Sequence, residues 1–111
     1  MNVGVHVLGN LYGCPNELLE KVDVVRSILW RATIEARFTA VGESFHQFEP
    51  AGVTGVILLS ESHMSIHTWP EKNFAAVDIF TCGEEGNAEE GFDLLCSFLK
   101  PQRIEKSIIR R

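Results

Sequence analysis

Residues 60–71, Ser-Glu-Ser-His-Met-Ser-Ile-His-Thr-Trp-Pro-Glu, concentrate side chains that can do covalent chemistry. The hydroxyl of Ser62 directly follows the carboxylate of Glu61, and two imidazoles lie four residues apart. The thiol of Cys82 follows one strand length later and comes within reach if the chain folds back as a hairpin. A hydroxyl or thiol becomes a nucleophile beside a base, and imidazole can donate or accept a proton near neutral pH. The stretch is therefore the first candidate for a reactive centre.

Six segments have the residue pattern of β-strands. Apolar and polar residues alternate over residues 3–9, as in a strand with one buried face. Residues 38–48 are expected to be extended with an interruption near Gly42, and β-branched and aromatic residues favour strands on both sides of a turn at Pro70. The expected strands are 3–9, 38–48, 53–59, 64–68, 74–81 and 103–109.

Two segments have the apolar spacing of helices. Between residues 18 and 36 apolar side chains recur one helical turn apart, and Pro15 suits the first turn because its missing N–H is not needed there. The second helix is expected over residues 88–99, with Asn87 as N-cap and Glu90 at the capping-box spacing. The order β-α-β-β followed by β-β-α-β predicts an α+β fold, a two-layer sandwich in which two helices cover one face of an antiparallel sheet.

Composition limits the function classes. A chain of 111 residues is one domain, 1–111, and is small for an enzyme that must also enclose a substrate, which a site shared across a dimer interface would solve. No apolar run is long enough to span a membrane, and the alternating N-terminus is unlike a signal peptide, so a cytoplasmic location is expected. Three cysteines without a CxxC pair are expected to be reduced thiols. A net charge of -5 argues against a nucleic-acid partner.

The chain resembles the prokaryotic S-adenosylmethionine decarboxylases, small proenzymes that cut their own backbone at a Glu-Ser bond. The resemblance extends over nearly the whole chain and rests on motifs in the family's order and spacing. They are Leu-Tyr-Gly-Cys at 11–14, Phe-His-Gln-Phe at 45–48, Gly-Val-Thr-Gly at 52–55, the stretch 60–71, and Phe-Thr-Cys-Gly at 80–83. The resemblance implies the same two-layer sandwich and a homodimer of cleaved protomers.

The resemblance implies cleavage at Glu61-Ser62 into chains 1–61 and 62–111. Ser62 would attack the preceding carbonyl to form an ester, and elimination and loss of ammonia would convert it to a pyruvoyl group. The ketone of that group would accept the amine of S-adenosylmethionine as a Schiff base and take up electrons as carbon dioxide departs, so no bound coenzyme is needed. The product would be the aminopropyl donor of polyamine synthesis.

The resemblance also assigns roles to other residues. His67 would transfer protons during processing, Cys82 would protonate the substrate carbon after decarboxylation, and Thr54, where the family usually has serine, would aid processing. Phe48 would stack on the adenine. Without the resemblance Cys82 would be interpreted as a buried apolar thiol and Phe48 as a core residue.

Two further substrate contacts and a metal alternative complete the candidates. Trp69 is a second stacking residue, although a tryptophan before a turn is as often in the core, and Glu71 would contact the ribose or the amine. His63 and His67 have the spacing of a helical zinc motif, but Thr-Trp-Pro after them argues against a helix, and no third ligand has suitable spacing. No metal is therefore expected.

Three departures from the family pattern leave the substrate open. Asn10 stands where the family often has glutamate, Val5 where a basic residue is frequent, and residues 72–73 replace an aromatic-glycine pair. One alternative is a pyruvoyl-dependent arginine or ornithine decarboxylase on the same scaffold. Another is an uncleaved, non-enzymatic paralogue that binds a nucleoside-like ligand.

Overall fold

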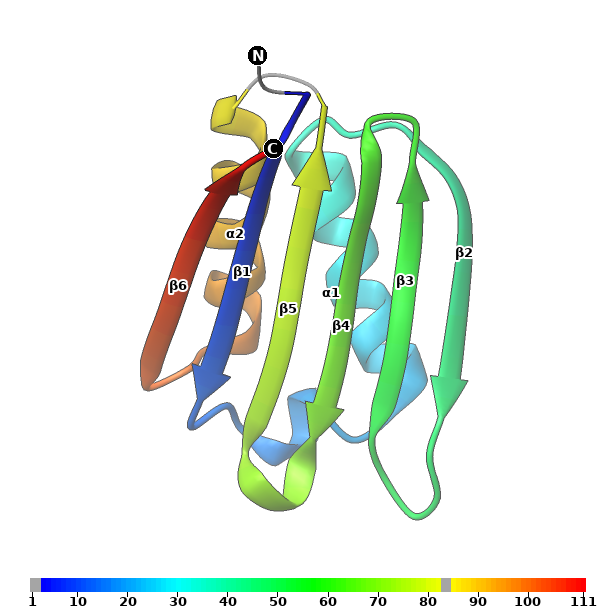
Figure 1. Ribbon diagram of the computed structural model, residues 1–111. Coiled ribbons are helices and arrows are strands. Elements are labelled where there is room, and N and C mark those ends of the chain that lie inside the picture. The colour runs from blue at the N-terminus through cyan, green and yellow to red at the C-terminus, as the bar shows by residue number, and fades with distance from the viewer. Residues whose placement is uncertain (1–2, 83–84) are drawn as a thin grey trace.

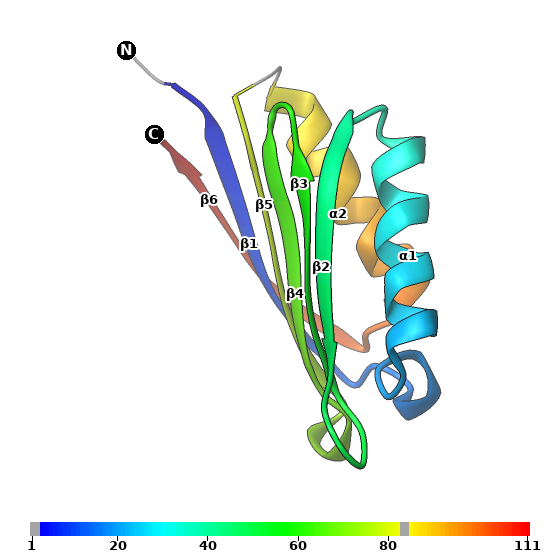
Figure 2. The same ribbon diagram turned by 90° about the vertical axis from the view of Figure 1, so that its right-hand side faces the viewer.

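The fold consists of one antiparallel sheet with two helices against one of its faces (Figure 1, Figure 2). The computed structural model describes residues 3–82 and 85–111. In this part of the chain the strands are ordered β2-β3-β4-β5-β1-β6 across the sheet. The strands are β1 (Val5–Tyr12), β2 (Ala40–Gln47), β3 (Val53–Leu59), β4 (Ser62–Trp69), β5 (Phe74–Thr81) and β6 (Arg103–Arg110), and the helices are α1 (Val22–Glu35) and α2 (Glu85–Leu99).

The core lies between the sheet and the helices. Strand side chains alternate between the two faces of a sheet, so every second residue of the inner strands faces the helices. Val7, Ile57, Met64, Ile66 and Ile79 are completely buried on this covered face, together with Val25, Leu29, Leu95 and Leu99 from the two helices. Gly9 on β1 leaves room for the ring of Phe92, which would collide with any Cβ at that position. The inner strands of the sheet are therefore packed against the helices, whereas β6 at the edge is largely exposed.

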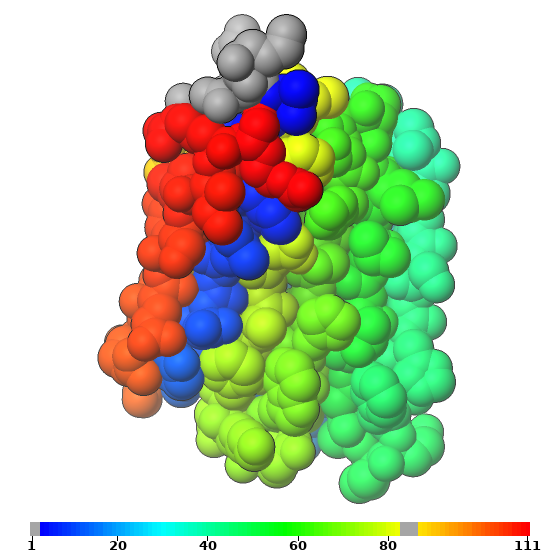
Figure 3. All heavy atoms as spheres, in the orientation of Figure 1, coloured from blue at the N-terminus to red at the C-terminus, as the bar shows by residue number. Residues whose placement is uncertain are grey.

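No described helix covers the other face of the sheet, called the open face below (Figure 3). This face carries polar and aromatic side chains from all strands. It also carries three large apolar side chains, Leu58, Trp69 and Ile109, which are 50%, 41% and 49% exposed. Within the described residues no helix is long and apolar enough to cross a membrane.

The predicted fold class, the six strands and the two helices are confirmed, but both helix starts are wrong. Residues 16–18 form a separate 3₁₀ turn, and α1 begins only at Val22, because Lys21 is extended. The N–H of Val22 donates to the side-chain oxygen of Gln47 on β2 at 2.6 Å, a cap supplied by a distant strand. Asn87 lies inside α2, which begins two residues earlier, because only three residues separate the helix from β5.

Candidate active site

The Glu61-Ser62 bond lies at the exit of a tight turn. Leu59 at the end of β3 pairs with Ser62 at the start of β4, which leaves only Ser60 and Glu61 to reverse the chain. Ser62 has a φ of 154°, in a region that side chains other than glycine rarely adopt. Such a conformation costs roughly 1–3 kcal/mol and is found mainly where the surrounding structure enforces it at a functional site.

Hydrogen bonds from neighbouring segments hold this turn in place. The backbone N–H of Cys82, just beyond β5, donates to the carbonyl oxygen of Glu61 at 2.8 Å. The carboxylate of Glu61 accepts the N–H of Thr39 at 3.2 Å, and the N–H of Ser60 donates to the Thr39 carbonyl at 2.8 Å. The carbonyl of the bond predicted to be cut is thus polarised by a fixed donor, the arrangement that stabilises negative charge on an oxygen under attack.

Cys82 is the accessible thiol of the described residues. Its side chain is exposed, whereas Cys14 is buried and Cys96 is partly buried. Burial raises the pKa of the Cys14 thiol to about 11, and burial, with Asp93 nearby, raises the pKa of Cys96 to about 11. Both thiols therefore stay protonated and unreactive near neutral pH. The interpretation of Cys82 as a buried thiol is wrong.

A second group of predicted site residues meets at the other end of β4. Thr54 on β3 and His67 on β4 are paired in register, and the Thr54 hydroxyl lies 3.0 Å from Nδ1 of His67. They line a pocket of about 240 Å³ with Phe48, Trp69 and Glu71. Five residues named separately from the sequence thus share one pocket. Its volume is below the roughly 300–1,000 Å³ of a typical small-molecule site.

The aromatic side chains of this pocket are presented to solvent. Phe48 is 47% exposed and packs edge-on against His46, with ring centroids 4.6 Å apart. Trp69 is 41% exposed and lies between the rings of His67 and Phe74. Neither belongs to the core, so the core interpretation of both residues is wrong. Exposed rings at a pocket rim are available to stack on a flat ligand.

Gln47 fixes the loop that carries Phe48, and the sequence interpretation missed it. Its side-chain nitrogen donates to the carbonyl oxygens of Glu20, Phe48 and Gly52 at 2.8, 3.0 and 3.0 Å. The same amide caps α1 through its oxygen. Gln47 therefore ties the first helix to the rim of the pocket.

Within one chain the structure does not bring the two groups together. Ser62 and His67 are five residues apart on a continuous strand, which separates them by roughly 16 Å at 3.3 Å per residue. His67 of the same chain is therefore too far away to exchange a proton with the Glu61-Ser62 bond. A single chain holds two half-sites: the cleavage end (Glu61, Ser62 and Cys82) and the pocket end (Phe48, Thr54, His67, Trp69 and Glu71).

Comparison with known proteins identifies the family. The family model described as S-adenosylmethionine decarboxylase matches residues 5–111. The chain belongs to the S-adenosylmethionine decarboxylase family. It is 44% identical over 111 residues to the S-adenosylmethionine decarboxylase proenzyme of Archaeoglobus fulgidus, covering 100% of this chain and 99% of that protein. It is 41% identical over 109 residues to the proenzyme of Aquifex aeolicus, covering 98% of this chain and 81% of that one.

Solved structures give the same answer for the fold. The crystal structure of the adenosylmethionine decarboxylase from Aquifex aeolicus matches with a TM-score of 0.96 and 40% identity, over 99% of this chain and 91% of that chain. The Trypanosoma brucei AdoMetDC-delta26 monomer matches with a TM-score of 0.67 and 16% identity, over 94% of this chain and 45% of that longer one, which is a likeness of fold.

Between the half-sites of this S-adenosylmethionine decarboxylase family member, three strands share a carboxylate. Nε2 of His6 and Nε2 of His63 lie 2.6 and 3.2 Å from the same oxygen of Asp78, and Ser65 donates to the other oxygen. Burial raises the pKa of the Asp78 carboxyl, but the hydrogen bonds from Ser65 and the imidazoles outweigh it and hold this pKa below its usual value.

The same cluster has the composition of a metal site. One ligand atom from each of His6, His63 and Asp78 lies within 4.8 Å of the others, and two imidazoles with a carboxylate suit a divalent transition metal. In this structure both imidazoles bond to the carboxylate of Asp78. His63 and His67, the pair considered and set aside from the sequence, cannot share an ion, because four strand residues separate them by roughly 13 Å.

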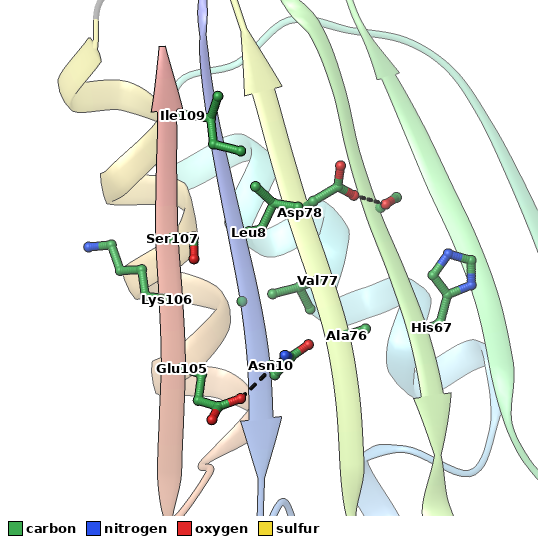
Figure 4. A pocket seen from close by; sticks show the side chains of 12 residues that line it. Leu8, Asn10, His67, Ala76, Val77, Asp78, Glu105, Lys106, Ser107 and Ile109 are labelled. Carbon is green, nitrogen blue, oxygen red and sulfur yellow. Dashed lines mark hydrogen bonds between the residues drawn. The ribbon is translucent and has the colours of Figure 1, made fainter. Parts of the chain in front are cut away.

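A hollow of about 830 Å³ runs along the open face between the cluster and the pocket end (Figure 4). Strands β1, β4, β5 and β6 line it, and Asp78 and Glu105 project into it from opposite sides. His67 stands at its margin, so the hollow adjoins the second half-site. The hollow is open to solvent in a single chain and would be enclosed by a second surface laid on the sheet.

Proposed function

We propose that this chain is a self-processing S-adenosylmethionine decarboxylase that cuts itself at Glu61-Ser62 and converts Ser62 into a pyruvoyl group. The observation that supports this most strongly is the strained Ser62 at the exit of a two-residue turn, with the N–H of Cys82 fixed 2.8 Å from the Glu61 carbonyl oxygen. Nothing about an ordinary hairpin requires that combination.

The cleavage chemistry follows from these groups. The oxygen of Ser62 attacks the Glu61 carbonyl carbon, and the carbon-nitrogen bond breaks as an ester forms. The Cys82 N–H stabilises the negative charge on the carbonyl oxygen during this exchange. Removal of the Cα proton of residue 62 then expels the Glu61 carboxylate, and water replaces the nitrogen as ammonia. The resulting ketone supplies an electron sink for decarboxylation of a bound amine.

We propose that two copies complete each site. Cleavage needs a base near the ester, and His67 of the same chain is roughly 16 Å away along β4. If two open faces pack about a two-fold axis with their β4 strands antiparallel, the pocket end of one copy lies over the cleavage end of the other. Leu58, Trp69 and Ile109 are exposed apolar side chains on that face, and such an interface would cover them.

In this arrangement the residues have separate tasks. Thr54 and His67 of one copy exchange protons with the Glu61-Ser62 bond of the other, and the hydroxyl fixes the imidazole ring through Nδ1. Cys82, exposed beside residue 62, donates the proton that the substrate carbon needs after carbon dioxide leaves.

The pocket end has the chemistry to bind S-adenosylmethionine. Phe48 and Trp69 offer ring faces for the adenine and for the positive sulfonium, and Glu71 offers a carboxylate for the ribose hydroxyls or the amine. The relatives named above carry the S-adenosylmethionine name. The comparisons therefore give no support to arginine or ornithine decarboxylation or to an inactive binding protein. The product would feed polyamine synthesis, and the three free cysteines fit a cytoplasmic location.

Mass spectrometry of the denatured protein tests the proposal. The freshly purified chain, followed over time, should yield a fragment of residues 1–61 and a fragment of residues 62–111 that is lighter than its sequence by one ammonia. Ser62→Ala should remain whole and inactive, while Ser60→Ala in the same turn should still cleave. A wild-type chain that never splits, or an active and uncleaved Ser62→Ala protein, would overturn the mechanism.

A further inference from the structure

Thr81 stands out because its hydroxyl is buried without a partner. The residue is completely buried, and its Oγ1 is the one buried side-chain oxygen or nitrogen in the described part of the chain that makes no hydrogen bond. Burying an unsatisfied hydroxyl costs folding free energy, and valine has the same shape without that cost. A buried hydroxyl without a hydrogen-bond partner needs an explanation, and the groups around it are the first place to look for one.

Its surroundings point to the cleavage site. Thr81 ends β5, and its partner in register on β4 is Ser62, while its partner on β1 is the apolar Val5. Residues directly opposite each other across an antiparallel pair share a face, with Cβ atoms roughly 4.5–5.5 Å apart. Ser62 is thus the one cross-strand neighbour of Thr81 that has a hydroxyl.

Backbone hydrogen bonds hold Thr81 beside the Glu61-Ser62 bond. Cys82, the next residue, holds the Glu61 carbonyl through its N–H at 2.8 Å. The end of β5 is thereby fastened to both sides of the Glu61-Ser62 bond, through the ladder at Ser62 and through the carbonyl of Glu61.

We infer that Thr81 is a positioning residue for maturation, whose free hydroxyl hydrogen-bonds the Ser62 oxygen as that oxygen bonds to the Glu61 carbonyl carbon. This inference rests on the proposed function, because it assumes cleavage at that bond. A hydroxyl can accept the Ser62 O–H before attack and donate to the ester oxygen afterwards. Thr81 keeps its own proton throughout, and the Ser62 hydroxyl proton ends on the Ser62 nitrogen as that nitrogen leaves the Glu61 carbonyl carbon. The unpaired Thr81 hydroxyl lowers the stability of the folded chain, but it orients the Ser62 oxygen for attack.

Two measurements on Thr81→Val test the inference. In the wild-type background, Thr81→Val should slow cleavage about tenfold or more, the effect of losing one hydrogen bond to a reacting oxygen. Thr81→Ser, which restores the hydroxyl, should cleave at close to the wild-type rate. In a Ser62→Ala background, where the chain stays whole, Thr81→Val should melt at the same or a higher temperature than Ser62→Ala alone.

Thr33→Val is the matched control. Thr33 is also a buried threonine, but its hydroxyl already donates to the Leu29 carbonyl at 2.8 Å and contacts the sulfur of Met64 at 3.8 Å, so it is not free to bond Ser62. This variant should lower the melting temperature and leave the cleavage rate unchanged, the opposite of Thr81→Val on both counts.

The outcomes separate the inference from the function it rests on. If the wild-type chain stays whole, the proposed function fails. If the wild-type chain cleaves and Thr81→Val cleaves equally fast, the function stands and Thr81 is simply a buried hydroxyl. Should Thr81→Val fail to fold, Thr81→Ala removes the hydroxyl without added bulk. Cleavage of Thr81→Ala at the wild-type rate would equally overturn the inference.

Discussion

Strand β4 begins and ends in regions built on different principles. At the cleavage end, backbone groups do the work: a constrained Ser62, a two-residue turn and the N–H of Cys82 against a carbonyl. At the pocket end the functional groups are side chains: a hydroxyl hydrogen-bonded to an imidazole, and two aromatic rings around a small pocket. The first end is suited to rearranging its own chain, and the second to receiving another molecule.

The distance between these ends cannot be shortened within one chain. β4 is paired along its length with β3 on one side and β5 on the other, and its inner face is packed against the helices. A strand so held has no hinge. Strand geometry therefore keeps the two ends apart within one chain, which is why the proposed function brings them together between two copies.

Mixed dimers give the sharpest test of the separation. Ser62→Ala and His67→Ala should each be inactive alone. When they are co-expressed, a mixed dimer has one site with an intact Ser62 from one chain and an intact His67 from the other. Random pairing should then restore about a quarter of the wild-type decarboxylase activity.

The control for this experiment combines two changes at the same end. Ser62→Ala mixed with Cys82→Ser has no site with both groups intact and should be no more active than Cys82→Ser alone. If Ser62→Ala with His67→Ala also recovers none, although mixed dimers are present by native mass spectrometry, the site is complete within one chain.

Cys82→Ser should separate the two roles of the cleavage end. The backbone N–H that holds the Glu61 carbonyl is unchanged, so the chain should still cleave. The hydroxyl is a far weaker acid than the thiol, so kcat should fall about a hundredfold, the usual range for losing a proton donor. Fragment masses and release of carbon dioxide measure the two effects. Cys96→Ser is the control, and full activity of Cys82→Ser would remove the thiol from its role.

Phe48→Ala should affect only the pocket end. Cleavage should proceed normally, while KM for S-adenosylmethionine should rise about tenfold, because stacking of an aromatic ring on a base contributes roughly 1–3 kcal/mol. Ile34→Ala, which is 67% exposed on α1 and lines neither the pocket nor the open face, should leave KM unchanged. Equal effects of the two variants would mean that Phe48 acts through general packing.

Gln47→Ala should have the smallest effect on chemistry and a measurable one on stability. It removes the cap of α1 and the bonds to Phe48 and Gly52, so the free energy of unfolding should drop by about 1–2 kcal/mol. Urea unfolding in the Ser62→Ala background measures this on an intact chain. Gln102→Ala, at an exposed position, should change little. A null result for Gln47 would show that water replaces its bonds.

Local patterns were enough to predict the elements, and the resemblance to the family named the residues that line the pocket. Alternation and helical spacing are set by neighbours in the chain, and the motifs around Phe48, Thr54 and His67 carry the family's order. The separation of Ser62 from His67 was also within reach, since residues 64–68 were predicted as strand and a strand has a fixed rise per residue.

Other features depend on which strands become neighbours, which no local pattern records. His6, His63 and Asp78 meet only because β1 and β4 both flank β5. The cap on α1 comes from Gln47, 25 residues away. Thr81 looks like any β-branched strand residue until its register with Ser62 is known.

The place of β1 in the sheet has a consequence for the order of the unfolding reaction. Cleavage after Glu61 would leave β1 on the first fragment, inserted between β5 and β6 of the second and paired with each along its full length. The two fragments could then separate only if the sheet unfolded, so cleavage would leave the folded structure intact. Cleavage would instead change refolding from a one-chain to a two-chain reaction. The melting temperature would then rise with protein concentration.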